Sequence, residues 1–194
     1  MDLAGMKTLK FDETDDALIF SLPLGISCPY AGACKSFVLR TTAEVVHLPQ
    51  TSNTKEEPHL CPAVEIESDK ENRKRHWYNW DLIREVLYTS EDQTLALKEL
   101  IELSLQMRPP KSKVIIHRAG DFWIETYMKA WLLVACDRQS QEFHASTKSL
   151  SMWWNLQHLV PQNFHLCATY GGTLDSLIDL YPHVFHTTQR LTVA

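Results

Sequence analysis

The sequence lacks a long hydrophobic run, and its first residues lack the apolar core of a secretory signal. No stretch approaches the roughly 20 apolar residues that a membrane-spanning helix needs. Residues 1–16 are rich in charged side chains, unlike the apolar core of a signal peptide. There is no low-complexity tract and no strong internal repeat. We therefore expect a cytoplasmic protein that makes no membrane contact.

Positive charge is also scarce. The formal net charge is -5 and the isoelectric point is about 6.0, which excludes a broad electrostatic attraction to nucleic acid. One local exception is a basic run followed at once by aromatic residues. This mixture could bind phosphate and stack a base, or it could be the solvated face of a helix whose apolar side is buried. The basic residues are Lys70, Arg73, Lys74 and Arg75.

Cysteine is present in an odd number, five, without a secretory signal, so a disulfide framework is not expected. Cys28 and Cys34 lie in a loop that contains proline and glycine, and Cys61 follows a polar segment. Three thiolates close together favour zinc or an iron–sulfur cluster. In a [4Fe-4S] cluster the remaining iron could bind a small molecule, whereas His59 or His47 could complete a zinc site. Alternatively, the three cysteines are small apolar fillers.

The composition is that of a folded domain, and the order of elements predicts its class. Of 194 residues, 44% are hydrophobic and 22% charged, which fits one domain with a real core. We divide it into a cysteine-bearing region of strand and loop (1–65), a helical segment (66–112) and βα units (113–194). Alternating strands and helices favour a parallel sheet. The predicted fold is α/β, with parallel βα units forming a partial (β/α) barrel or an open sheet.

Hydrophobic spacing gives the expected elements. The second predicted helix starts at Ser90, which forms a capping-box spacing with Gln93. Cys136 is expected on the buried side of a helix and Cys167 inside a strand, both as packing residues. Strands are expected at residues 17–22, 114–117, 143–146, 164–168 and 184–187, and helices at 66–88, 90–108, 123–136, 150–159 and 173–180.

Polar residues follow three of the predicted strands, and in a parallel sheet such loops share one edge. Asp121 could be a general base or nucleophile assisted by His117, or it could only cap the next helix. Lys148 could bind a phosphate or carboxylate, with Ser149 capping the helix that follows. Thr147 could add a hydroxyl. The pair Gly171 and Gly172 would allow a ligand to approach the backbone.

The order of these motifs resembles the gene product 88-like proteins of bacteriophages and prophages. The resemblance covers most of the chain and rests on SLPLGISCPYAGACKS, Cys61, HWYNWDLI, IHRAGDFW, STKSLSMWW, PQNFHLCATYGG and LDSLI. It implies a phage protein, located in the host cytoplasm, but no settled reaction. The three cysteines and the βα units are in turn similar to radical S-adenosylmethionine barrels, which hold a [4Fe-4S] cluster on three cysteines, although here the cysteines do not form the usual tight triplet.

The leading hypothesis is therefore an iron–sulfur phage protein that acts as an enzyme on a small molecule, a nucleotide or a nucleic acid. Its cluster would be held by Cys28, Cys34 and Cys61, and S-adenosylmethionine is one candidate co-substrate. A second hypothesis is a zinc-stabilised module that binds nucleic acid or a host protein. A third is a hydrolase or transglycosylase that depends on Asp121 and needs no redox metal. The sequence does not predict an oligomeric state.

Overall fold

The computed structural model describes residues 6–32, 34–47 and 61–187. His59 lies outside this part of the chain. The elements of the described residues are β1 (Asp12–Glu13), β2 (Ala17–Phe20), β3 (Ser36–Val38), β4 (Val45–His47), α1 (Ala63–Ser68), α2 (Lys70–Thr89), α3 (Gln93–Gln106), β5 (Lys113–Ile116), α4 (Glu125–Asp137), β6 (Glu142–Thr147), α5 (Leu150–Leu156), a 3-10 turn (Gln157–Leu159), β7 (Phe164–Ala168) and α6 (Ser176–Leu180). None of the described helices combines the length and apolar character needed to cross a membrane.

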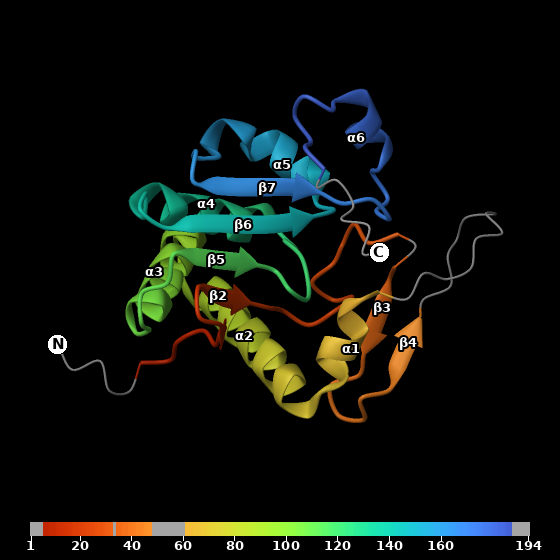
Figure 1. The fold of residues 1–194 in the computed structure, drawn as a ribbon. Coiled ribbons are helices and arrows are strands. Elements are labelled where there is room, and N and C mark those ends of the chain that lie inside the picture. The colour runs from red at the N-terminus through yellow and green to blue at the C-terminus, as the bar shows by residue number, and fades with distance from the viewer. Residues whose placement is uncertain (1–5, 33, 48–60, 188–194) are drawn as a thin grey trace.

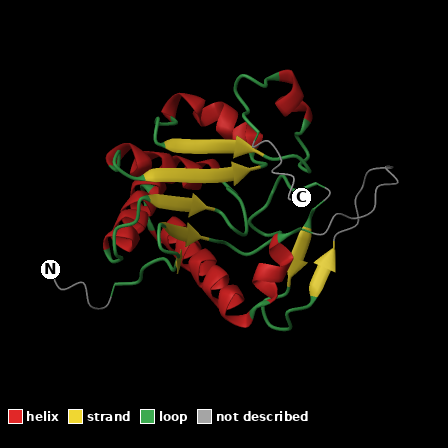
Figure 2. Cartoon of the chain, in the orientation of Figure 1, coloured by secondary structure: helices red, strands yellow, loops and turns green. Residues whose placement is uncertain are grey.

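The main sheet has the strand order β1-β2-β5-β6-β7. Strands β2, β5, β6 and β7 are mutually parallel, and only the short β1 pairs antiparallel with β2. Over the described residues this is an open sheet with edges at β1 and β7, so the α/β prediction is confirmed in its open-sheet form. A separate hairpin of β3 and β4 lies beyond the ends of the parallel strands (Figures 1 and 2).

Helices cover one face of the sheet. In Figure 1, α3, α4 and α5 lie behind the strands, whose other face is turned to the viewer. Along a strand, buried side chains that face the helices alternate with more exposed side chains that face away from them. On β6, Phe143 and Ala145 are buried, while Glu142 is exposed and His144 half-buried. The main hydrophobic core thus lies between the sheet and the helices, with Trp131 of α4 fully buried in it.

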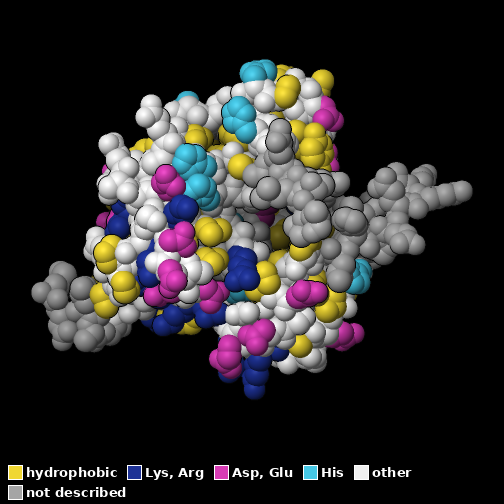
Figure 3. All heavy atoms as spheres, in the orientation of Figure 1, with side chains coloured by type: hydrophobic (Ala, Val, Ile, Leu, Met, Phe, Trp, Pro, Cys, Tyr) yellow, Lys and Arg dark blue, Asp and Glu magenta, His cyan; other side chains and the backbone are white. Residues whose placement is uncertain are grey.

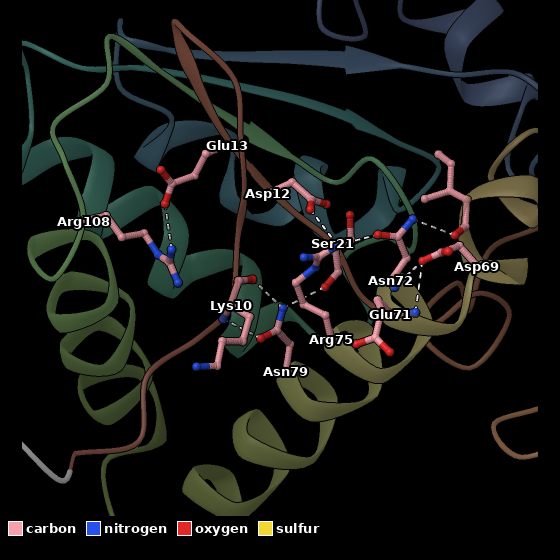
Figure 4. A network of polar contacts seen from close by, with 11 residues as sticks. Lys10, Asp12, Glu13, Ser21, Asp69, Glu71, Asn72, Arg75, Asn79 and Arg108 are labelled. Carbon is pink, nitrogen blue, oxygen red and sulfur yellow. Dashed lines mark hydrogen bonds and ion pairs between the residues drawn. The ribbon is translucent and has the colours of Figure 1, made fainter.

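Polar side chains attach the N-terminal segment to α2 (Figure 4). The buried amide of Asn79 accepts a hydrogen bond from the backbone nitrogen of Lys10 (2.7 Å) and donates to the carbonyls of Lys10 (2.9 Å) and Ser21 (3.2 Å). Arg75 pairs with Asp12 at 2.6 Å. These contacts satisfy backbone groups of a segment that has almost no regular structure of its own.

Several predicted elements differ from the structure. The single helix expected at 66–88 is two helices, α1 and α2, which meet at Asp69. Ser90 does not cap a helix N-terminus, because α2 continues to Thr89 and the backbone nitrogen of Ser90 bonds to the carbonyl of Val86. Asp92 caps α3 instead, accepting a hydrogen bond from Leu95 at 3.0 Å. Residues 184–187 do not form a strand. Only Thr187 forms an isolated parallel bridge, to Ala168.

Candidate functional site

A cavity of about 290 Å³ opens where the parallel strands end. Its walls come from the loop after β2, the start of α1 and the loops after β5, β6 and β7. The polar and thiol side chains of its lining come from three groups: the N-terminal cysteines, the residues after β5, and one residue each from the loops after β6 and β7. They are Cys28, Cys34, Cys61, His117, Arg118, Asp121, Lys148 and Thr169. Of the residues predicted to share this edge, His117, Asp121 and Lys148 line the cavity, whereas Thr147, Gly171 and Gly172 do not.

The loop that carries Cys28 and Cys34 is held tightly at its base. Backbone bonds join Leu22 to Ala119 (2.9 Å), and the carboxylate of Glu67 accepts from the backbone nitrogen of Leu24 (2.6 Å). Gly120, with φ +87°, makes the approach possible, because a Cβ there would lie 2.5 Å from the Ser27 hydroxyl oxygen. The loop after β2 is thus packed directly on the loop after β5.

The three thiols differ in their electrostatics. A hydrogen bond from the Cys61 thiol, opposed by burial and assisted by Lys148, lowers the pKa of Cys34 to about 6. The same interaction, together with burial, raises the pKa of Cys61. Burial, with the nearby Asp121 carboxylate, raises the pKa of Cys28 to about 12. Cys34 is therefore the thiolate of the group in the absence of metal.

Asp121 joins three strand-end loops. Its carboxylate accepts hydrogen bonds from the Thr147 hydroxyl (2.5 Å) and from the backbone nitrogens of Phe122 (2.7 Å) and Lys148 (2.9 Å). Its own backbone nitrogen donates to the Ser27 hydroxyl at 3.4 Å. Burial raises the pKa of Asp121, and these hydrogen bonds act in the opposite direction. The arrangement makes Asp121 a brace between loops.

The expected capping roles are absent from the described residues. The helix after Asp121 begins only at Glu125, and no side chain caps it, because the Asp121 carboxylate is turned to Thr147 and Lys148. Ser149 occupies the N-cap position of α5 as predicted, but its side chain makes no capping hydrogen bond. Its hydroxyl donates to the carbonyl of Phe122 at 2.6 Å. Both polar residues connect the loop after β5 to the loop after β6.

His117 is buried at the wall of the cavity. Its Nε2 is 2.8 Å from the hydroxyl of Tyr127, whereas Nδ1 has no hydrogen-bond partner among the described residues. Burial lowers the pKa of His117 to about 3, so the imidazole is neutral near pH 7. The carboxylate of Asp121 is not among its hydrogen-bond partners. A neutral imidazole here can donate to or accept from a ligand.

Two cations line the cavity. The ammonium of Lys148 donates to the Thr169 hydroxyl at 3.1 Å, and Arg118 is largely exposed. Arg118 gave no signal in the sequence, because a single arginine after a strand is common. Arg118 and Lys148 give the cavity two positively charged groups of the kind that bind a phosphate or carboxylate.

The pair Gly171 and Gly172 supports the cysteine loop. Their backbone nitrogens donate to the two carboxylate oxygens of Asp175, at 2.7 and 2.9 Å, so this nest already holds an anionic group. The Gly171 carbonyl accepts from Gly32 at 2.9 Å. The sequence did not single out Asp175, although its place three residues after the glycines is a usual spacing for a side chain that closes a turn.

The other predicted residues have separate surroundings. Arg73 is buried and donates to the carbonyls of Arg40, Glu67 and Ser68, while Lys74 pairs with Glu71. A phosphate bound at this basic run would compete with those contacts, and nucleic-acid binding there stays a prediction. Cys136 is exposed on α4, so its predicted burial is wrong, and Cys167 is half-buried on β7.

Comparison with known proteins gives one result. The family model described as Gene product 88 matches residues 4–193. No curated protein and no solved structure matches the chain.

Proposed function

Because the chain belongs to the Gene product 88 family of bacteriophage proteins, we propose that it is a phage iron–sulfur protein that binds a small anionic ligand beside its cluster. Cys28, Cys34 and Cys61 would hold a [4Fe-4S] cluster. The observation that supports this most is the convergence of three thiols from separate segments on one cavity at the strand ends.

The residues present fit such a group. Cys34 is readily ionised, as a metal ligand must be. Lys148 and Arg118 line the same cavity and would offset the negative charge of three thiolates. Bound clusters of this type transfer single electrons, and an iron without a cysteine ligand can bind a small molecule.

The spacing of the thiols leaves both a cluster and one zinc ion open. Sulfur atoms on a single tetrahedral zinc lie about 3.8 Å apart, since each Zn–S bond is ~2.3 Å. Among the described residues, only Glu142, His144 and His165 form a group whose ligand atoms all lie within 4.8 Å of one another. The three sulfur atoms are therefore not all that close together, although Cys61 is near enough to Cys34 to hydrogen-bond to it. Zinc stays the alternative, with His47 near the cavity through its contact with Ser36 (3.1 Å).

The chain's own polar groups define what the ligand must carry. Lys148 and Arg118 would bind a phosphate or carboxylate. The Nδ1 atom of His117 is buried, so the ring would have to turn before this atom could hydrogen-bond to the ligand. The Asp121 brace fixes the backbone from which Lys148 projects. A nucleotide has this combination, and so does the amino-acid part of S-adenosylmethionine.

The test is the iron, zinc and acid-labile sulfide content and the visible spectrum of protein purified without oxygen. Wild type should contain iron and sulfide and absorb near 400 nm, and each of Cys28→Ala, Cys34→Ala and Cys61→Ala should lose them. Cys136→Ala, at an exposed thiol on α4, is the matched control and should keep the full content. A colourless wild-type protein, with zinc or without metal, contradicts the cluster.

The third hypothesis, a hydrolase built on Asp121, stays a prediction. Its carboxylate already accepts two hydrogen bonds on Oδ1 and one on Oδ2, which weakens it as a nucleophile or base. Should the protein contain no metal, an activity assay of Asp121→Asn against wild type on nucleotide and glycosidic substrates is the next measurement. Full activity in the variant would reject this hypothesis.

A further inference from the structure

The uncovered face of the sheet is polar where its strands begin. Parallel sheets usually carry helices on both faces, and their strands are then apolar throughout. Here Glu142 and His165 are exposed and His144 is half-buried. The residues that alternate with them along β6 and β7 are buried in the core. Figure 3 shows histidine and acidic side chains side by side on this face. This face is therefore built for contact with water or a polar ligand.

Two histidines on neighbouring strands face one another. His144 of β6 and His165 of β7 are direct partners in the parallel register. Their rings stack with centroids 4.6 Å apart and planes 28° apart. The Nε2 atom of His144 lies 3.2 Å from a carboxylate oxygen of Glu142, which points to the same face because it lies two residues earlier on β6.

These three side chains offer converging ligand atoms. One atom from each lies within 4.8 Å of the other two. The side chains of Glu142 and His144 are 54% and 41% exposed, so small rotations can bring the donors to the separations that one ion needs. An ion pair alone would explain Glu142 and His144, but it leaves the second imidazole without a role.

We propose that Glu142, His144 and His165 bind a divalent transition-metal ion, with zinc as the best fit. Two imidazole nitrogens and one carboxylate oxygen are zinc ligands, and three protein ligands leave the fourth position for water. Calcium and magnesium prefer oxygen ligands and would not use the two imidazoles. Nickel and copper ions would bind the same donors.

This site is independent of the cysteine cavity. The two sites share no residue, and His144 lies two residues, about 7 Å at ~3.3 Å per residue, before Ser146, the first residue of β6 that lines the cavity. The metal site would persist if the cluster proposal failed, and the reverse is also true. The two proposals can therefore be separated by counting bound ions.

The experiment is isothermal titration of Zn²⁺ into the reduced variant Cys28→Ser/Cys34→Ser/Cys61→Ser. We expect one zinc ion per chain, and His144→Ala or His165→Ala in this background should weaken binding at least ~10-fold, because each removes one of three protein ligands. His158→Ala, on the exposed 3-10 turn, is the matched control and should bind as the parent does. Unchanged binding in either His144→Ala or His165→Ala overturns the proposal.

Two further measurements keep the test decisive. If the triple variant does not fold, the zinc content of the metal-loaded wild-type chain is compared with that of His165→Ala, which should hold one ion fewer. His183 and His186 line a neighbouring cavity together with His165. Loss of binding in His183→Ala with full binding in His144→Ala would assign the ion to that cavity and reject the site proposed here.

Discussion

At the scale of single residues, the thiols carry the clearest chemical signature. Cys34 has a pKa of about 6 because it accepts a hydrogen bond from Cys61 and lies near Lys148. An ordinary thiol has a pKa of ~8.5. Cys34 is therefore the most readily ionised of the three thiols near neutral pH.

We predict that iodoacetamide modifies Cys34 in metal-free, reduced protein with a half-maximal rate near pH 6. Cys61→Ala removes the hydrogen-bond donor, so the midpoint should move to higher pH. Mass spectrometry of peptides from a pH series measures both. Cys28→Ala is the control, since Cys28 is not the donor. A midpoint that is the same in wild type and Cys61→Ala would contradict the assigned hydrogen bond.

Glu67 predicts a pH dependence of stability. Burial raises its pKa from 4.5 to about 7, although Leu24 donates to its carboxylate. The folded state therefore prefers the protonated acid, so its contribution is fully present below pH 4.5 and is lost as pH rises through 7. Across that window the loss is about 3 kcal/mol, at ~1.4 kcal/mol for each pKa unit.

Glu67→Gln resembles the protonated acid and should remove this dependence. We expect wild type and variant to have similar free energies of unfolding at pH 4.5, and the variant to be more stable by about 3 kcal/mol at pH 8. Urea unfolding of metal-free protein at the two pH values measures the difference. An equal difference at both would show that Glu67 is ionised throughout.

At the scale of elements, the strand-end loops are fixed by close backbone contact. Gly120 and Gly171 both have positive φ, +87° and +93°. A Cβ at Gly120 would lie 2.5 Å from the Ser27 oxygen and 2.8 Å from Leu22, whereas a Cβ at Gly171 would meet only Lys148, at 3.6 Å. An alanine at either position would have the same unfavourable positive φ, but only at Gly120 would its Cβ also clash with neighbouring atoms.

Gly171→Ala should therefore cost ~1–2 kcal/mol, from the left-handed backbone alone. Gly120→Ala should cost a further ~1–3 kcal/mol, because the loop after β2 must move away. Chemical denaturation of the two variants gives the comparison. Equal losses of stability in the two variants would mean that the loop after β2 can move away from residue 120 without a measurable loss of folding free energy.

The sequence predicted the strands well because they have a strong signal. Runs such as that at Val114 and Ile115 are apolar, and the intervening helices carry buried stripes. Local signals failed where two elements compete for one residue. Ser90 has the spacing of a helix start, yet α2 extends to it and Asp92 caps α3.

The sequence predicted several residues of the candidate site, but it did not predict the hydrogen bonds between them. In a parallel sheet, the residues that follow the strands lie at one edge. This rule was enough to predict that Asp121 and Lys148 lie close together. That Asp121 braces the loops, and that Cys61 contacts Cys34, depends on side-chain directions that spacing does not encode. The group of Glu142, His144 and His165 did leave a signal, the period-two alternation of polar residues on β6, but recognising it requires knowing which strand lies beside β6.

At the scale of the whole molecule, the main core lies apart from the three thiols. The main cluster of buried apolar residues fills the layer between sheet and helices, whereas the thiols line a cavity at the strand ends, where Cys61 packs against a second, smaller apolar cluster. The main cluster, whose apolar contacts supply most of the folding free energy, does not include the thiols. Stability and metal content should therefore be separable.

We predict that the chain folds cooperatively without metal. The variant Cys28→Ser/Cys34→Ser/Cys61→Ser should unfold in urea in one transition with the m-value of wild type, since m follows the surface exposed on unfolding. Metal-loaded wild type should be more stable than the metal-free chain through ligand linkage. A non-cooperative transition in the variant would indicate that the metal organises the fold, as in small zinc domains.

The Asp121 brace also limits how the length of this chain can vary. One carboxylate joins the loops after β5 and β6, and the Ser27 hydroxyl connects the loop after β2 to the same point. An insertion in any of these loops would displace the other two. The hairpin turn between β3 and β4 has no such link to the brace: Arg40 contacts α2 through Arg73 and Asp81, and the next two residues, Thr41 and Thr42, are exposed. Added residues, such as a reporter tag, should be accommodated between Thr41 and Thr42.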